Sequence, residues 1–146
     1  TLRRLGLDQE VQRVMTTPFW CLLIAIFMPY VCSGTAVYFK AKQFGSVDNN
    51  QPRVQSAALT GTGARANAAQ QNAWEALAVF SASVLVAHVS GADPGGSATA
   101  SLVFIAARIL HAIFYLADLA PLRSLSFLVA TLACMRLWWL AAAAAA

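Results

Sequence analysis

The sequence predicts an all-α protein, a transmembrane four-helix bundle, and three observations support this fold class. Hydrophobic residues make up 59% of the 146-residue chain and charged residues only 11%, whereas a soluble domain carries about 25% charged residues. The apolar residues gather in four stretches that polar segments separate. Because one membrane span needs roughly 20 apolar residues, four spans use nearly the whole chain. We therefore expect an integral, multi-pass membrane protein.

Each element is assigned from its own pattern. Residues 1–17 place apolar and charged side chains at helical spacing, which is typical of an amphipathic helix lying at the membrane interface. The remaining domain, residues 18–146, holds the four spans, which we expect at about residues 19–39, 65–89, 98–116 and 123–140. A long polar loop, residues 45–63, joins the first two spans, and loops of this length are usually functional or mobile.

The distribution of positive charge predicts the orientation in the membrane. The formal net charge is +4, and with four spans both chain ends lie on the side of Arg3, Arg4 and Arg13. The opposite side carries more basic residues, namely Lys40, Lys42, Arg53, Arg65 and Arg123. Because lysine and arginine favour the cytoplasmic side, we expect the first and third loops to be cytoplasmic. No basic and aromatic array of the kind that binds nucleic acid is present.

Three polar residues inside the third span are the strongest pointer to function. Arg108, His111 and Tyr115 are spaced i, i+3 and i+7, which puts all three on one face of a helix. A charged arginine inside a bilayer is costly, so such residues usually face a protein interior or a wet cavity. The triplet therefore predicts a polar site within the bundle.

The predicted topology brings further polar residues to the same membrane surface as the triplet. Asn72 and Glu75 share a helix face near the start of the second span, and Arg65 lies two turns before Asn72. The third span ends and the fourth begins at that surface, which adds Arg123 and Ser124. If these residues act together, they line one pocket formed by three helices, and this is the functional interpretation.

Several of these residues also have a purely structural interpretation. Glu75 and Arg108 could neutralise each other as a buried pair that fixes the geometry of the bundle. Tyr115 could be an interfacial anchor, and Arg123 could be a positive charge beside a lipid headgroup. The shared membrane side and helix face of the whole set favour the functional interpretation.

The three cysteines do not belong to the predicted polar cluster. Cys21, Cys32 and Cys134 all fall within apolar stretches, where we expect small, buried residues with free thiols. The sequence therefore predicts neither a protein thiol as nucleophile nor a metal site.

Two long segments and one short one resemble the MAPEG family, the membrane-associated proteins in eicosanoid and glutathione metabolism. The first is the run Arg65-Ala-x-x-Ala-x-x-Asn72-x-x-Glu75, which is similar to the second-helix motif of the family. The second and more specific segment runs from Arg108 to Ser124, and it resembles prostaglandin-forming members without a gap. Met28-Pro29-Tyr30 also resembles bacterial members. The resemblance covers roughly residues 18 to 140.

The resemblance implies a homotrimer with glutathione, as the thiol substrate, between adjacent subunits. It also implies a role for each matching residue. Glutathione contacts would come from residues of three helices, namely Arg65, Asn72, Glu75, Arg108, His111 and Ser124. Arg123 would lie beside the sulfur and stabilise the glutathione thiolate, and Tyr115 would be a further glutathione contact. On chemical grounds, Tyr115 could also offer a second hydrogen-bond donor. Membrane lipids and a hydrophobic small-molecule substrate would be the other partners.

Two functions follow from this pattern. The first is a membrane-embedded, glutathione-dependent transferase or peroxidase that acts on hydrophobic electrophiles. The second is a non-catalytic lipid-binding or accessory subunit of a larger membrane complex. The second is motivated by Ala68 and Gln71, which stand where eicosanoid-forming members carry basic residues, and by Tyr38, which replaces an arginine of the first span. A transporter is disfavoured because so short a chain lacks an internal repeat.

Overall fold

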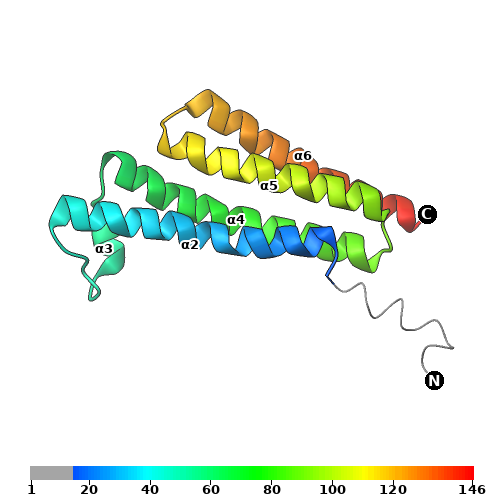
Figure 1. Ribbon diagram of the computed structural model, residues 1–146, viewed down its shortest axis with the longest axis horizontal. Helices are drawn as coiled ribbons and strands as arrows, with labels where there is room; N and C mark the ends of the chain where they lie inside the picture. The colour runs from blue at the N-terminus through cyan, green and yellow to red at the C-terminus, as the bar shows by residue number, and fades with distance from the viewer. Residues whose placement is uncertain (1–14) are drawn as a thin grey trace, which may run out of the picture.

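The computed structural model describes residues 15–146, and this part of the chain contains helices and no strand (Figure 1). The helices are α2 (Thr17–Phe44), α3 (Pro52–Ala57), α4 (Gly61–Val89), α5 (Pro94–Leu116) and α6 (Ala120–Ala144). All except α3 are long and apolar enough to cross a membrane. The predicted all-α bundle with four spans is therefore confirmed. The interfacial helix predicted over residues 1–17 lies outside the described residues, apart from its last three, of which Thr17 already belongs to α2.

The long helices extend beyond the predicted spans because helix signals continue past the apolar stretches. α5 begins at Pro94, four residues before the predicted start, and a proline is favoured in the first turn of a helix. The Asp93 carboxylate accepts a hydrogen bond from the Gly96 amide at 2.6 Å, which caps the helix. Hydropathy thus locates the apolar part of a span, whereas capping residues determine where the helix starts.

The first loop is more ordered than the sequence predicts. It contains α3, and side chains of α2 hold both ends of that helix. The Lys40 ammonium, which is buried, donates to the Pro52 carbonyl at 3.1 Å. The Gln43 amide donates to the Ala58 carbonyl at 3.1 Å and accepts from the Thr60 amide, also at 3.1 Å. These contacts tie the loop to the end of α2, which loop length and composition alone do not indicate.

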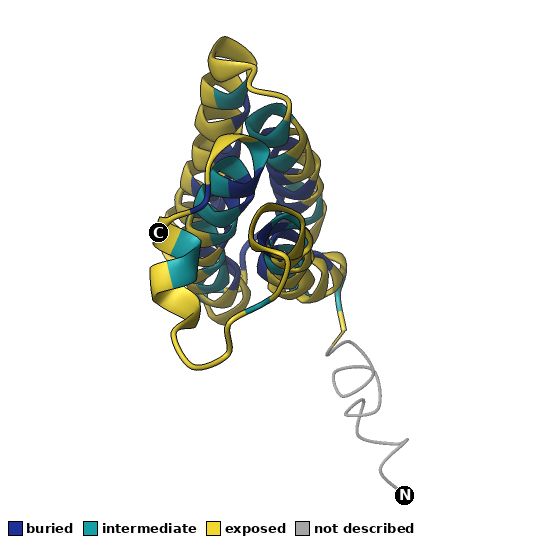
Figure 2. Cartoon of the chain, turned by 90° about the vertical axis from the view of Figure 1, so that its left-hand side faces the viewer, coloured by how far each residue is buried: buried dark blue, intermediate teal, exposed yellow. Residues whose placement is uncertain are grey.

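Two helix pairs form the bundle. α2 packs mainly against α4, and α5 packs mainly against α6 (Figure 1). Buried residues face inward where the two pairs meet (Figure 2). The centre of this core is the pair Phe80 and Phe104, whose rings stack with centroids 3.9 Å apart and planes 8° from parallel. Because lipid is as apolar as the core, close packing of this kind holds transmembrane helices together.

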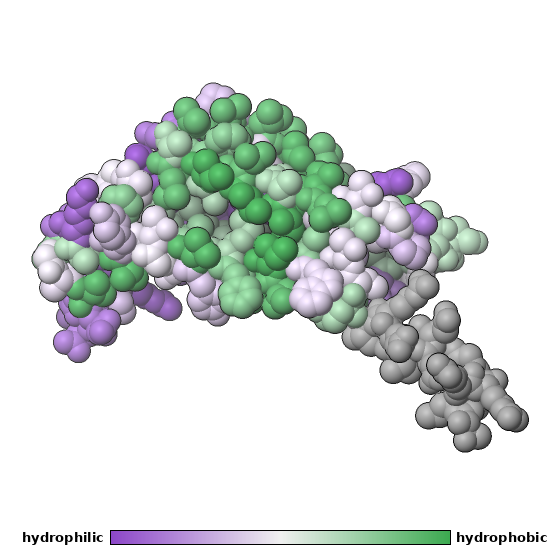
Figure 3. Space-filling view, viewed as in Figure 1, coloured by the Kyte–Doolittle hydropathy of each residue, from purple (hydrophilic) through white to green (hydrophobic). Residues whose placement is uncertain are grey.

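The outer surface carries a broad apolar band. Green hydrophobic atoms cover the middle of the molecule in Figure 3, and hydrophilic atoms gather mainly towards the two ends. Large apolar side chains such as Trp20, Phe27 and Trp139 are more than half exposed. A patch of this size marks a surface that meets lipid or another protein, which agrees with the membrane assignment.

Truncation of the central ring should weaken the bundle selectively. Phe80→Ala is expected to lower the free energy of unfolding in detergent by about 3 kcal/mol, because it leaves a cavity against Phe104. Phe27→Ala is the matched control, since Phe27 is 59% exposed on α2, and its effect should stay within about 0.5 kcal/mol. Equal losses in the two variants would contradict this assignment of the core.

Candidate functional site

The Arg108 side chain crosses between the two helix pairs and is 3% exposed. Its Nη2 donates to the Asn72 side-chain oxygen at 2.8 Å and to the Asn72 backbone carbonyl at 3.3 Å. Its Nη1 is buried and has no hydrogen-bond partner within the described chain. A buried donor without a partner is uncommon in folded proteins. Asn72 therefore holds one nitrogen of Arg108, and the other has no partner within the described chain.

Glu75 is connected to Arg108 only through Asn72. The Asn72 amide nitrogen donates to the Glu75 carboxylate at 3.5 Å, a long hydrogen bond. Between residues 15 and 146, the sole ion pair joins Arg65 and Asp118, so the Glu75–Arg108 pair considered above does not form. The physical reason is that Asn72 occupies the guanidinium, while the Glu75 side chain faces outward and is exposed. Glu75 therefore presents a carboxylate at the outer rim of the site.

His111 and Arg123 form a second group, one helical turn beyond Arg108. The His111 Nδ1 lies 3.1 Å from the Arg123 backbone carbonyl. Because a carbonyl oxygen only accepts, Nδ1 carries the hydrogen and donates it. The His111 Nε2 is buried without a partner in the described structure. This contact joins the last turns of α5 to the first turn of α6.

The Arg123 guanidinium stacks on Tyr115. Its Cζ atom lies 4.5 Å from the centroid of the Tyr115 ring, a cation–π contact that orients the planar cation. The same Arg123 carbonyl that binds His111 also accepts from the Ser126 hydroxyl at 2.8 Å. Ser126 was not among the predicted site residues. Its hydroxyl holds the backbone of Arg123, and the pattern of polar side chains in the sequence does not reveal a contact of this kind.

Arg65 and Ser124 contribute less to the group than the sequence suggests. Arg65 donates to the Leu116 carbonyl at 3.3 Å, and its guanidinium lies 3.4 Å from the Asp118 carboxylate. Asp118 has a φ of 62°, a left-handed conformation that aspartate adopts more often than most residues, and Arg65 stabilises this turn between α5 and α6. Ser124 is exposed. Arg65 therefore stabilises the backbone at the rim of the site. Ser124 lies next to Arg123 in the chain, and its side chain makes no described contact.

A groove of about 290 Å³ opens beside the buried Arg108. Asn72, Glu75 and Arg108 form its polar end, and the rest of its wall is largely apolar. That part of the wall comes from α4, α5 and α6. Its residues are Ala76, Val79, Phe104, Phe127, Ala130, Thr131 and Cys134. The groove thus joins a polar end to an apolar channel, as a site for an amphipathic ligand requires.

Cys134 lines this groove, which the sequence did not indicate. All three cysteines are free and buried, as predicted. Cys134 nevertheless shares the groove with Arg108, because α6 places it two turns beyond Ser126 on the inner face. Among residues 15–146, no group of three or more His, Cys, Asp or Glu is arranged to hold a metal ion.

Loss of the Asn72 side chain should destabilise the bundle more than loss of a neighbouring polar side chain. Asn72→Ala leaves the buried Arg108 cation without its side-chain acceptor, which is expected to cost about 3 kcal/mol of unfolding free energy in detergent. Gln71→Ala is the control, because Gln71 is exposed one position away. If both variants unfold alike, Asn72 does not hold Arg108.

One of three comparisons with known proteins identifies a family. The model of the MAPEG family matches residues 17–143, which include all four spans and every residue of the two polar groups. The searches of curated proteins and of solved structures returned no match. Because the match covers the core of the bundle from the first turn of α2 to the last of α6, the chain belongs to the MAPEG family.

Proposed function

We propose that this chain is a glutathione-dependent transferase or peroxidase that acts on hydrophobic electrophiles in the membrane. The observation that carries the proposal is the Arg123 guanidinium. It has no acidic partner within residues 15–146, and the Tyr115 ring fixes its plane at 4.5 Å. A cation that is oriented but has no counter-ion is suited to an anion supplied by a substrate.

The residues of the site fit the charges of glutathione, which carries one ammonium, two carboxylates and a thiol. The exposed Glu75 carboxylate suits the ammonium, and the free Nη1 of Arg108 suits an anionic or carbonyl oxygen. The buried Nε2 of His111 is an acceptor, since Nδ1 is the donor to Arg123. The donors and acceptors therefore lie on the helices where the family resemblance assigns glutathione contacts.

Arg123 would act on the thiol by favouring its ionised form. A free thiol has a pKa of about 8.5, and the thiolate is the nucleophile. A guanidinium next to the sulfur in a site with little water lowers that pKa, and arginine does so without losing its own charge. The bound thiolate would then attack an electrophilic atom of a lipid-soluble substrate that reaches the groove from the bilayer.

We further infer a homotrimer with the site between subunits. Glu75 and much of the apolar surface of α2, α4 and α6 are exposed in a single chain. The groove is also open on one side, so a neighbouring subunit would complete its wall. The orientation that we propose keeps the first and third loops in the cytoplasm, where the thiol substrate is abundant.

A second candidate function is a non-catalytic lipid-binding or accessory subunit. It is favoured by Ala68 and Gln71, which supply no positive charge for the carboxylates of glutathione. In that case the same groove would hold lipid.

Replacement of Arg123 should separate these roles. Arg123→Ala is expected to abolish the near-ultraviolet thiolate absorbance seen on adding glutathione, and to slow turnover of an electrophile about 10²-fold. Arg136→Ala is the matched control, because Arg136 lies on the same helix about 20 Å further along, and it should leave both signals unchanged. Persistence of the thiolate signal without Arg123 would remove its proposed role.

Calorimetry of glutathione binding in detergent tests the substrate itself. The wild-type protein is expected to bind glutathione saturably at millimolar concentration. Glu75→Gln should weaken binding about tenfold, because it removes a charged partner of the ammonium. Asp48→Asn, which changes an exposed carboxylate in the first loop outside the candidate site, is the control and should bind normally. Absence of saturable binding by the wild type would instead support the accessory subunit.

A further inference from the structure

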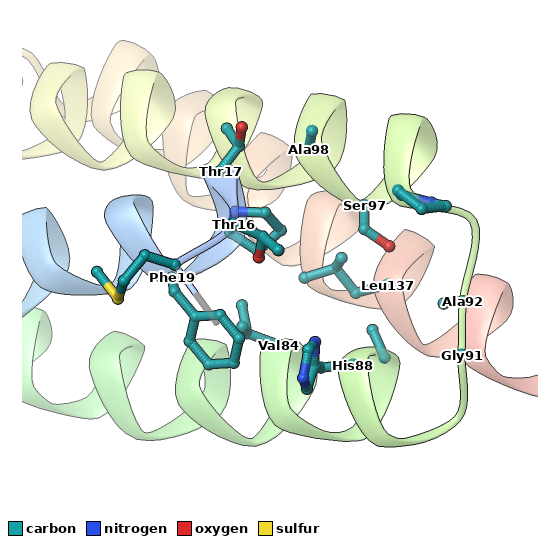
Figure 4. Close-up of a pocket in the computed structure, with 14 residues that line it drawn as sticks. Thr16, Thr17, Phe19, Val84, His88, Gly91, Ala92, Ser97, Ala98 and Leu137 are labelled. Atoms are coloured by element: carbon teal, nitrogen blue, oxygen red, sulfur yellow. The ribbon is translucent and has the colours of Figure 1, made fainter. Parts of the chain in front are cut away.

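Two cavities lie at the end of the bundle where α5 begins and α6 ends. The larger has a volume of about 560 Å³, and its wall includes Ser97 and Ala98 of α5 and Leu137 of α6 (Figure 4). The smaller is a groove of about 430 Å³ on another side of the same two helices, and its wall includes Thr99 and Arg136. Of these two cavities, the groove is the one whose described wall carries a charged side chain.

The groove runs from Arg136 towards the middle of the bundle. Its wall covers residues 96 to 103 of α5 and residues 129 to 136 of α6, and seven residues of helix span about 10 Å. Ala100 and Ala133 are the small, buried residues between its ends, and each is 5% exposed. The groove is therefore a channel with a cation at one end and mainly apolar residues along the rest.

Arg136 is a cation without an acidic partner in the described structure. Residues 132 to 140 are apolar apart from Arg136, and within residues 15–146 the sole ion pair joins two other residues. The Asp93 carboxylate, which precedes α5, accepts instead from the Gly96 amide at 2.6 Å. An arginine in a membrane span is costly unless it meets an anion or reaches the interface. Trp139, one turn further, is 68% exposed and marks the level of the lipid headgroups.

We propose that this groove binds an acyl chain of a phospholipid with a net negative headgroup, and that Arg136 binds its phosphate. A guanidinium forms paired, charge-assisted hydrogen bonds with a phosphate. The described wall contains no carboxylate, so it offers no partner to the ammonium of a zwitterionic headgroup. The part of the acyl chain nearest the headgroup would lie along Val103 and Val129.

This lipid site is independent of the proposed glutathione chemistry. Arg136 lies about 20 Å along α6 from Arg123, and no candidate glutathione contact belongs to the wall of the groove. Loss of the lipid site should therefore leave the thiolate signal unchanged.

Photolabelling of the full chain in phosphatidylcholine nanodiscs tests the proposal. The probe is phosphatidylglycerol with a diazirine in its acyl chain, and labelled positions are mapped by mass spectrometry. Saturable labelling is expected within residues 96–103 and 129–136, and unlabelled phosphatidylglycerol should compete for it. Arg136→Gln should raise the half-saturating mole fraction about tenfold, because it removes the charge-assisted contact. Arg53→Gln, which removes an exposed arginine from the first loop, is the matched control and should leave that fraction unchanged.

A second pair of variants tests the position of the acyl chain. Val103→Trp fills the groove from a position that is 41% exposed and should abolish the saturable labelling. Leu102→Trp changes an exposed neighbour outside the groove wall and should not. Equal labelling in these two variants, or equal half-saturation in Arg136→Gln and Arg53→Gln, would overturn the proposal.

Two further outcomes bear on the occupant of the groove. Labelling that does not saturate, as expected if a second subunit covers the groove, would overturn the lipid site. Phosphatidylethanolamine with the same diazirine is expected to label these residues without saturation. Saturation by this zwitterionic probe at the same mole fraction as phosphatidylglycerol would overturn the negative headgroup.

Discussion

Burial of the Arg108 cation is the constraint on which the rest of the bundle depends. A guanidinium that is 3% exposed in a membrane protein needs acceptors, and Asn72 supplies two of them from the other helix pair. Two hydrogen bonds from one nitrogen fix the register of α4 against α5. The same bonds orient Asn72 towards Glu75 at the rim. One buried charge therefore sets both the helix register and the polar end of the groove.

The backbone carbonyl of Arg123 has a comparable role at the membrane surface. His111 donates to it from α5 and Ser126 donates to it from the next turn of α6. Two donors on one oxygen hold the first turn of α6 against the end of α5. The Arg123 side chain then has Tyr115 beneath it. Histidine 111 thus positions a neighbouring cation through its backbone, a role that residue spacing on a single helix cannot reveal.

The sequence was sufficient for the fold class because membrane burial imposes a simple pattern of apolar length. It also placed Arg108, His111 and Tyr115 on one face, because helical periodicity is local. Which polar atoms pair across helices depends on rotation and side-chain reach, so the Glu75–Arg108 pair was one of several open alternatives. Cys134 was missed for the same reason, since nothing in its local sequence indicates that its helix turns it into the groove.

The two ends of the bundle differ in which buried polar groups lack a hydrogen-bond partner. In the half of the bundle where α6 begins, Arg108 keeps a buried donor and His111 a buried acceptor without a partner in the described structure. At the other end, the Ser97 hydroxyl is the buried side-chain group without a partner among residues 15–146. A buried polar group without a hydrogen bond lowers the free energy of unfolding, and the loss is largest where water cannot reach the group. Of these residues, Arg108 lines the groove beside Asn72 and His111 does not, so Arg108 is where a ligand in that groove could remove this loss. Because Arg108 carries a positive charge, the proposed function would place an anionic or carbonyl oxygen of its substrate there.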